Sequence, residues 1–236
     1  MADTATLNLP LIAASQAQKH VTVNEALARI DAALQLSVTS RTETTPPSTV
    51  EDGVSYLVPS GGVNAWSGQD GDVAFYINGG WEFVTPLSGW RIFVTDEALD
   101  IRFNGGEWED NPLSSSPFGA AMRAETVEFD YTIGAGATVP TGFVIPDGSI
   151  VFAVTGLVVD PVTGTLTDWS LGVDVSDTRY GSGYGLGAGS WVRGLTGQPQ
   201  AYYSNTQLKL TANGGDFSGG TVRLAVHLLR FDVPRA

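Results

Sequence analysis

The sequence predicts a mainly β protein with one short N-terminal helix, a small antiparallel β-module and a C-terminal β-sandwich of jelly-roll type. Only residues 8–36 show a convincing helical periodicity. The remainder is a series of short, alternating apolar segments separated by Gly, Pro and Asn-Gly turn signals. Because no helical pattern interrupts the strands of the C-terminal half, a sandwich is the architecture expected there.

The helix is predicted from its start signal and its apolar spacing. The sequence TVNE at residues 22–25 fits a capping box, so we expect the helix to begin at Thr22. Spacings of four, three and four residues place one apolar stripe on it, formed by Val23, Leu27, Ile30 and Leu34. The stripe packs either on the chain's own β-domain or, as a short a/d seam, on copies of itself. Two heptads are too few to hold a coiled coil alone, so oligomerisation would also need the β-domains.

Residues 46–112 are predicted to form a tryptophan- and glycine-rich module of five or six short strands, beginning near Tyr56. Residues 75–82 and 101–109 resemble each other, and each contains an Asn-Gly pair that favours a tight hairpin. Four of the six tryptophans fall in this module: Trp66, Trp81, Trp90 and Trp108. Such rings either fill the core of a small β-module or offer flat faces on which sugars stack.

Three further segments complete the expected organisation. Residues 1–45 form an attachment or oligomerisation segment with the helix, residues 113–124 have the Pro- and Ser-rich composition of a linker, and residues 125–236 form the sandwich. Period-two alternation predicts the inward-facing side chains of its strands. Four of these sets are Val127, Phe129, Tyr131 and Ile133; Ile150, Phe152 and Val154; Trp169, Leu171, Val173 and Val175; and Val222, Leu224, Val226 and Leu228.

The alternation stops between residues 177 and 205, where glycines occupy many alternate positions. A long irregular loop on a sandwich is a common place for ligand contacts, and this one is rich in aromatic rings and arginine. The predicted glycan-binding residues are Tyr180, Tyr184, Trp191, Arg193, Tyr202 and Tyr203. Arg179 and Arg193 are suited to bidentate binding of carboxylate or hydroxyl groups. A flexible connection or a subunit contact is the alternative interpretation of the loop.

Composition excludes several classes of partner. The net charge is −13 with only two lysines, Lys19 and Lys209, so nucleic-acid phosphates and anionic lipid surfaces would repel the chain. Apolar runs are far shorter than the roughly 20 residues of a membrane-spanning helix, and the N-terminus has no basic region typical of a secretory signal. The chain has no cysteine, which excludes disulfides and thiolate metal sites. We therefore expect no nucleic acid, no membrane insertion, no metal and no cofactor.

Catalytic motifs are absent from the sequence, so we expect a protein that is not an enzyme. The two histidines, His20 and His227, have no nucleophile or metal-ligand partner at a recognisable spacing. A glycosidase, however, needs only two suitably separated carboxylates. Two acidic clusters keep that alternative open: Asp96, Glu97 and Asp100, and Asp168, Asp174 and Asp177.

Residues 7–112 resemble an uncharacterised family of alphaproteobacterial phage-type structural proteins, found in prophages and in gene transfer agents. The most specific residues are QAQKH at 16–20 and NEA at 24–26. The resemblance implies a virion spike or fibre subunit, with a gene transfer agent head spike favoured, on the surface of a particle made in the bacterial cytoplasm. It also implies attachment to host capsular or cell-surface polysaccharide and contacts with other capsid or spike proteins.

For this role a homotrimer is the preferred assembly, because fibres commonly use threefold packing of β-domains; a pentamer is expected if the protein occupies a capsid vertex. Two other functions stay open at this point. One is a polysaccharide-depolymerising spike, and the other is a purely structural adaptor between the capsid or tail and another fibre protein.

Overall fold

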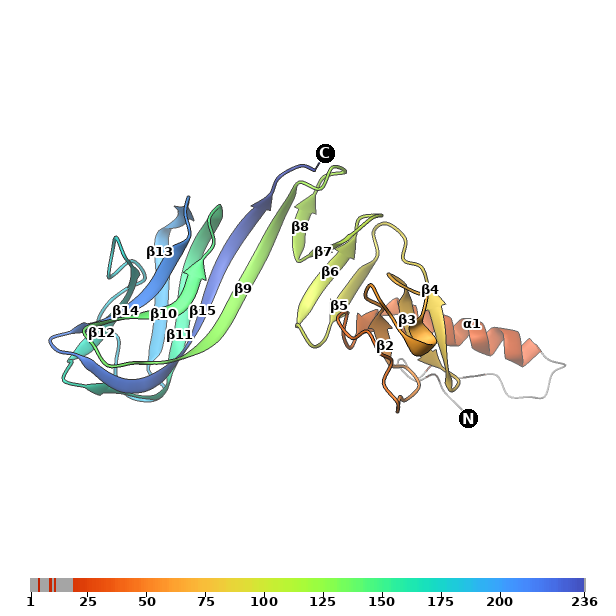
Figure 1. Cartoon of the computed structure of the whole chain (residues 1–236), viewed down its shortest axis with the longest axis horizontal. Helices are drawn as coiled ribbons and strands as arrows, with labels where there is room; N and C mark the ends of the chain where they lie inside the picture. Colours follow the sequence, from red (N-terminus) through yellow and green to blue (C-terminus); the bar gives the residue numbers. More distant parts are fainter. Residues whose placement is uncertain (1–3, 5–8, 10, 12–18, 236) are drawn as a thin grey trace. The chain divides into compact units, whose positions relative to one another are not determined.

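The computed structural model of the chain describes residues 4, 9, 11 and 19–235. The chain divides into two compact units, Met1–Asn111 and Pro112–Ala236, which are described separately (Figure 1). The mainly β fold with one short N-terminal helix and several antiparallel sheets confirms the predicted fold class, while the jelly-roll type of the sandwich stays a prediction.

The N-terminal unit contains the helix and seven short strands within the described residues. Its elements are α1 (Lys19–Leu34), β1 (Ser37–Val38), β2 (Ser55–Leu57), the 3-10 turn η1 (Asn64–Trp66), β3 (Val73–Ile77), β4 (Gly80–Val84), β5 (Arg91–Val94), β6 (Leu99–Phe103) and β7 (Trp108–Asp110). They form a four-stranded sheet in the order β1-β5-β6-β7 and a three-stranded sheet in the order β2-β3-β4.

The two small sheets and α1 share one core. Val38, Phe75 and Ile101 are almost fully buried in it, and Ala32 of α1 packs against the same cluster. The β3–β4 hairpin turns at Asn78 and Gly79, which both have positive φ values, as the Asn-Gly signal predicts. β1 pairs in parallel with β5, so the segment that follows the helix is part of this unit's sheet and not a separate arm.

The tryptophans of this unit serve packing. Trp66 is fully buried, and its ring lies 5.2 Å from that of Tyr56 and 5.3 Å from that of Trp81. Trp108 packs on Phe103 at 5.1 Å between ring centroids. Of the two interpretations of these rings, the core interpretation fits their positions, because tilted and edge-to-face neighbours occupy the ring faces.

The start of α1 differs from the sequence prediction. The helix begins at Lys19, so Thr22 lies inside the first turns and is not an N-cap. The residues at 19–21 are all compatible with a helix, and adding residues to a helix that already exists is far easier than starting one. A capping-box sequence alone therefore did not fix the first residue of α1.

The C-terminal unit is a two-layer antiparallel sandwich. Its strands are β8 (Pro112–Ser115), β9 (Ala121–Thr132), β10 (Thr138–Ile145), β11 (Ser149–Gly164), β12 (Asp168–Val173), β13 (Trp191–Tyr202), β14 (Thr206–Asn213) and β15 (Phe217–Asp232). One sheet has the order β13-β11-β15-β9-β8 and the other β10-β14-β12. The long strands β9 and β15 run side by side with an unbroken register from Ala121↔Asp232 to Thr132↔Thr221 (Figure 1).

The inner faces of both sheets meet in one apolar core. Val154 and Leu224 come from the five-stranded sheet, and Leu171 and Leu210 come from the three-stranded sheet; all four are fully buried. The alternation predicted for Val222, Leu224, Val226 and Leu228 is confirmed, since all are 2% exposed or less.

Three predictions for this unit were wrong. The expected linker at 113–124 instead contributes most of β8 and the start of β9. A register shift between Val151 and Ala153 turns Phe152 outward, where it is 42% exposed. Val175 is 85% exposed because β12 ends at Val173.

Candidate functional site

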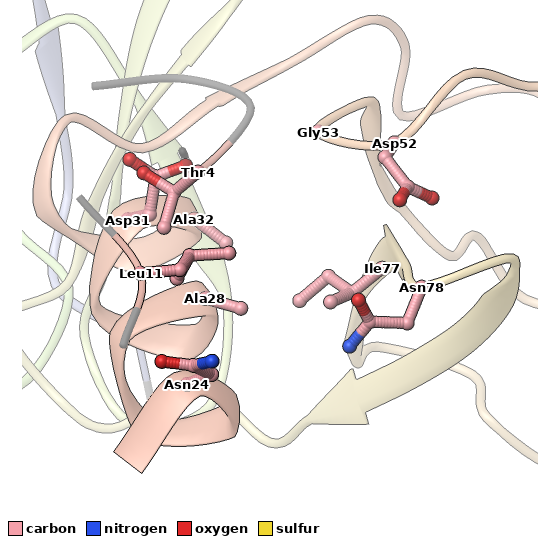
Figure 2. A pocket seen from close by; sticks show the side chains of 10 residues that line it. All are labelled: Thr4, Leu11, Asn24, Ala28, Asp31, Ala32, Asp52, Gly53, Ile77 and Asn78. Atoms are coloured by element: carbon pink, nitrogen blue, oxygen red, sulfur yellow. The ribbon is translucent and has the colours of Figure 1, made fainter. Parts of the chain in front are cut away.

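One face of α1 packs on its own unit. Asn24, Ala28 and Ala32 face Ile77 and Asn78 across a cavity of about 190 Å³ (Figure 2). Asp31 lies on the same side of the helix and is 3% exposed. Ala32 packs against the core of the two small sheets, whereas Asn24 and Ala28 line the cavity. Burial of this face holds α1 to the N-terminal unit.

The predicted apolar stripe faces away from this packed side. Val23 is 39% exposed, Ile30 52% and Leu34 64%, while Leu27 is half-buried. At 100° per residue the stripe is centred about 110° from the packed face, and the exposed alanines Ala26 and Ala33 border it. Among the side chains that the structure describes, none in this sector is charged, although the spacing places Lys19, the first residue of α1, in the same sector. The interpretation that the stripe packs on the chain's own β-domain is therefore wrong for the three exposed side chains.

An ion pair fixes the remaining side of α1 without covering the stripe. Arg29 Nε donates to Glu82 Oε2 of β4 at 3.0 Å. Both side chains are substantially exposed, so the pair contributes little stability. Arg29 therefore contacts β4 from a second side of α1, while the apolar stripe stays exposed.

A second surface lies on the outer face of the five-stranded sheet, where a groove of about 400 Å³ is formed. Two cross-strand rows line it. In the first row, Trp191, Leu157 and Arg223 come from β13, β11 and β15. In the second row, Arg193, Thr155, Ala225 and Glu128 come from β13, β11, β15 and β9. The small Ala225 side chain in the middle of the second row leaves room between the larger flanking side chains.

Trp191 and Arg193 form the β13 end of the groove. They lie two positions apart on one strand, so their side chains share a face. The Arg193 guanidinium carbon lies 4.7 Å from the centroid of the Trp191 ring, within cation–π range. Trp191 is nevertheless 65% exposed. The guanidinium therefore orients the ring without hiding it from solvent.

The other end of the groove holds a fixed ion pair. Arg223 donates to both carboxylate oxygens of Asp130, at 2.7 and 2.8 Å. These hydrogen bonds hold the pKa of Asp130 below its ordinary value of 3.8. Arg223 is thus already matched by a carboxylate, and Glu128 adds a second negative charge nearby.

The six predicted glycan-binding residues do not form one site. Trp191 and Arg193 share the groove, but Tyr180 and Tyr202 are buried in the core, at 0% and 7% exposure, and bond to each other. Tyr184 is half-buried against Trp169, and its hydroxyl donates to the backbone oxygen of Tyr180. These three tyrosines are unavailable for stacking because core side chains occupy their faces. Tyr203 is 92% exposed and lies outside the groove lining.

The irregular segment is also shorter than predicted, because 191–202 forms β13. Sequence reasoning missed the groove residues supplied by other strands: Glu128, Thr155, Leu157, Arg223 and Ala225. Their signal is the outward half of the alternation on β9, β11 and β15. Arg179, paired with Arg193 in the sequence-based expectation, instead donates to Gln200 at 3.1 Å.

Each acidic cluster considered for hydrolysis has carboxylates that take part in local bonds. Glu97 accepts from Arg41, Asp177 lies 3.0 Å from Lys209 Nζ, and Asp168 accepts from Asn213. His227 lies between Thr155 and Thr126, with its ring nitrogens 2.9 and 3.2 Å from their hydroxyl oxygens. Within the described part of the chain, no three His, Cys, Asp or Glu side chains gather to hold a metal ion.

No helix among the described residues has the length and apolar character needed to cross a bilayer. The side chain of the other histidine, His20, lies outside the described part of α1.

Comparison with known proteins finds a matching family model and matching solved structures. Residues 23–109 match a family described as "Protein of unknown function (DUF2793)", a match that covers less than half of the chain. None of the curated proteins matches the chain. Among solved structures, a chain of the "Cyanophage Pam1 capsid asymmetric unit" is 24% identical, with a TM-score of 0.36, over 50% of this chain and 90% of that chain.

Proposed function

We propose that this protein is a non-enzymatic structural subunit of a phage-like particle, a spike or fibre protein that attaches the particle to host polysaccharide. The observation behind the proposal is the uncovered apolar stripe of α1 on a unit that is otherwise folded and packed. The sequence resemblance of residues 7–112 to virion proteins supports the same role, with a gene transfer agent head spike as the favoured particle part.

The occupant proposed for the stripe is α1 of a second copy. The spacing of Val23, Leu27, Ile30 and Leu34 is that of a helix–helix seam. Ala26 and Ala33 beside it carry no charge and leave space for a neighbouring helix. A mixed polar partner surface would leave these six apolar side chains facing water or unpaired polar groups.

The energetics require a second contact in the assembly. Fully burying an exposed Leu or Ile contributes about 1.5–3 kcal/mol, and the stripe residues are only partly exposed, so pairing two helices contributes on the order of 5 kcal/mol. Association costs about 4–15 kcal/mol. A helix pair alone is therefore marginal, and contacts between β-domains or with other capsid proteins complete the assembly. A trimer is the favoured closed form, with a pentamer for a capsid vertex.

Light scattering on the purified full chain tests the assembly. We expect wild type to be an oligomer at micromolar concentration and Ile30→Glu/Leu34→Glu to have a lower mass. Gln35→Glu is the matched control, because it adds a negative charge at an exposed position off the stripe. A monomeric wild type, or a double variant with unchanged mass, would contradict the role assigned to α1.

Attachment and the absence of catalysis have separate tests. Purified capsular polysaccharide should retain the wild-type chain and should release no new reducing ends during incubation. Release of reducing ends that is lost on changing Asp177 or Glu97 to the amide would favour the depolymerase instead. If particles lacking the protein lost a second fibre protein but still attached to cells, the adaptor function would replace attachment.

A further inference from the structure

The groove on the five-stranded sheet has an unmatched cation at one end. Arg193 is exposed and contacts Trp191, and it takes part in none of the ion pairs found among the described residues. Arg223, the other guanidinium of the groove, is bound by Asp130 through both oxygens. Of the two guanidinium groups in the groove, Arg193 is therefore the one that can donate hydrogen bonds to a bound anion.

The carboxylate that lines the groove is too distant to neutralise Arg193. Glu128 and Arg193 stand at opposite ends of one row, separated by Ala225 and Thr155 on the intervening strands. Three strand spacings put their backbones about 14 Å apart. Glu128 and Arg193 accordingly form no ion pair with each other among the described residues.

The Trp191 ring offers a stacking surface beside this cation. A pyranose presents an apolar face of C–H groups that matches an indole ring, and an exposed ring is needed for such a contact. Arg193 lies on the ring at 4.7 Å, yet the residue stays 65% exposed. A sugar on the exposed part of the ring would have its ring substituents within reach of a planar, bidentate guanidinium.

Resting on the proposed attachment to polysaccharide, we infer that the β11–β13 half of this groove binds a pyranose that bears a carboxylate, such as a uronic acid. Trp191 stacks on the sugar ring and Arg193 binds the carboxylate. Leu157 extends the apolar surface next to Trp191, with which it is paired in register. The preference for acidic sugars comes from the direct contact with Arg193, because a chain with net charge −13 repels polyanions at longer distances.

A second copy of the chain is the competing occupant of this face. Leu157 is 39% exposed and Leu195 on β13 is 75% exposed, so the surface has apolar area beyond the groove. An oligomer contact would bury Trp191 together with these residues and would not require a free guanidinium. The presence of an unmatched arginine stacked on the exposed indole ring of the groove favours the acidic sugar.

Two monosaccharides that differ only in the C6 carboxylate provide the probe. Sodium glucuronate and glucose are titrated into the isotope-labelled full chain, and the Trp191 indole N–H resonance, assigned with Trp191→Phe, reports binding. We expect wild type to bind glucuronate about tenfold more tightly than glucose, the contribution of one hydrogen-bonded charge pair. Arg193→Gln should abolish this preference and leave the affinity for glucose unchanged.

Trp191→Ala should lose both sugars, whereas Tyr203→Ala, which removes an exposed ring outside the groove, should bind like wild type. Equal binding of the two sugars by wild type, or an unchanged preference in Arg193→Gln, would overturn the acidic-sugar inference while polysaccharide attachment still stands. No shift of the indole signal with either sugar, together with a lower mass of Trp191→Ala in light scattering, would assign the face to a second copy. Failure of the proposed function itself would appear as no retention by capsule.

Discussion

The hydroxyl oxygens of Tyr180 and Tyr202 lie 2.6 Å apart inside the core of the C-terminal sandwich. Tyr180 belongs to the irregular segment between β12 and β13, and Tyr202 is the last residue of β13. This bond, with the Tyr184 hydroxyl that donates to the Tyr180 backbone oxygen, ties the glycine-rich segment to the strand that carries the groove. The tyrosines thus hold the glycine-rich segment against β13 without facing a ligand themselves.

Removing one hydroxyl of this pair should destabilise the sandwich more than removing both. In Tyr202→Phe the Tyr180 hydroxyl is left buried without its partner, which costs about 1–3 kcal/mol of unfolding free energy. Tyr180→Phe/Tyr202→Phe leaves neither group unpaired and should recover much of that loss. Denaturant unfolding of the two single variants and the double variant measures the coupling; strictly additive effects would show that the two hydroxyls act independently.

The same tyrosines should make stability fall at alkaline pH. Burial raises the pKa of Tyr180, Tyr184 and Tyr202 above the ordinary value of 10.0. From about pH 10 upward the unfolded chain loses these protons more readily than the folded chain does, so unfolding becomes easier as the pH rises. The slope is at most about 1.4 kcal/mol per pH unit for the fully buried Tyr180 and smaller for the other two. Below pH 10 the contribution is fully present.

Unfolding free energy measured between pH 8 and 11 should therefore decline less steeply in Tyr180→Phe/Tyr202→Phe than in wild type. Tyr203→Phe is the control, because that side chain is 92% exposed and should leave the slope unchanged. Identical slopes in all three proteins would contradict the assignment to the buried pair.

The fold was predictable where local signals agree with long-range packing. Period-two alternation identified the inward faces of β9 and β15, and the Asn-Gly pair identified the β3–β4 turn. The errors have specific causes. The bulge at Val151–Ala153 depends on pairing with two neighbouring strands, and β8 forms from a Pro- and Ser-rich sequence only because it pairs with β9.

The site was less predictable because it is built across strands. Trp191 and Arg193 were identified from one segment, but Glu128, Thr155 and Arg223 reach the groove only through the register of β9, β11 and β15. Aromatic content could not separate exposed Trp191 from buried Tyr180. The two residues differ in exposure because Tyr180 fills space in the core between the sheets, whereas Trp191 lies on the outer face.

Gly194 on β13 should be intolerant of any side chain. A Cβ there would lie 2.3 Å from the Tyr180 backbone oxygen and 2.8 Å from that of Val154. Gly194→Ala should therefore push the tyrosine segment off β13 and cost about 1–3 kcal/mol or more. Gly197→Ala on the same strand is the control, since no atom lies within 4 Å of the added methyl group. Equal urea midpoints for Gly194→Ala and Gly197→Ala would show that the tyrosine segment moves away from β13 at no cost in stability.

Arg41 should stabilise the N-terminal unit alone. Its guanidinium donates to Glu97 at 2.7 and 2.8 Å and to Asp110 at 2.6 Å, bonds that raise the Arg41 pKa and join the loop after β1 to the β5–β6 turn and to β7. Arg41→Gln should cost about 1–2 kcal/mol, since the side chains are partly exposed. In calorimetry of the full chain, Arg41→Gln should lower the temperature of one unfolding transition and Tyr202→Phe that of another. If both variants shift the same transition, the two units unfold together.

The apolar stripe of α1 should matter for assembly and hardly at all for folding. Ile30 and Leu34 are more than half exposed in the isolated chain, so replacing them with Glu removes little buried area. At a concentration where the oligomer has dissociated, the unfolding free energy of Ile30→Glu/Leu34→Glu should lie within about 0.5 kcal/mol per substitution of wild type. Ala32→Glu, on the packed face beside the core, should destabilise strongly because it buries a charge. A large loss of stability in the stripe variant would mean that α1 packs through these residues on its own unit, and the proposed helix–helix contact would then lack its surface.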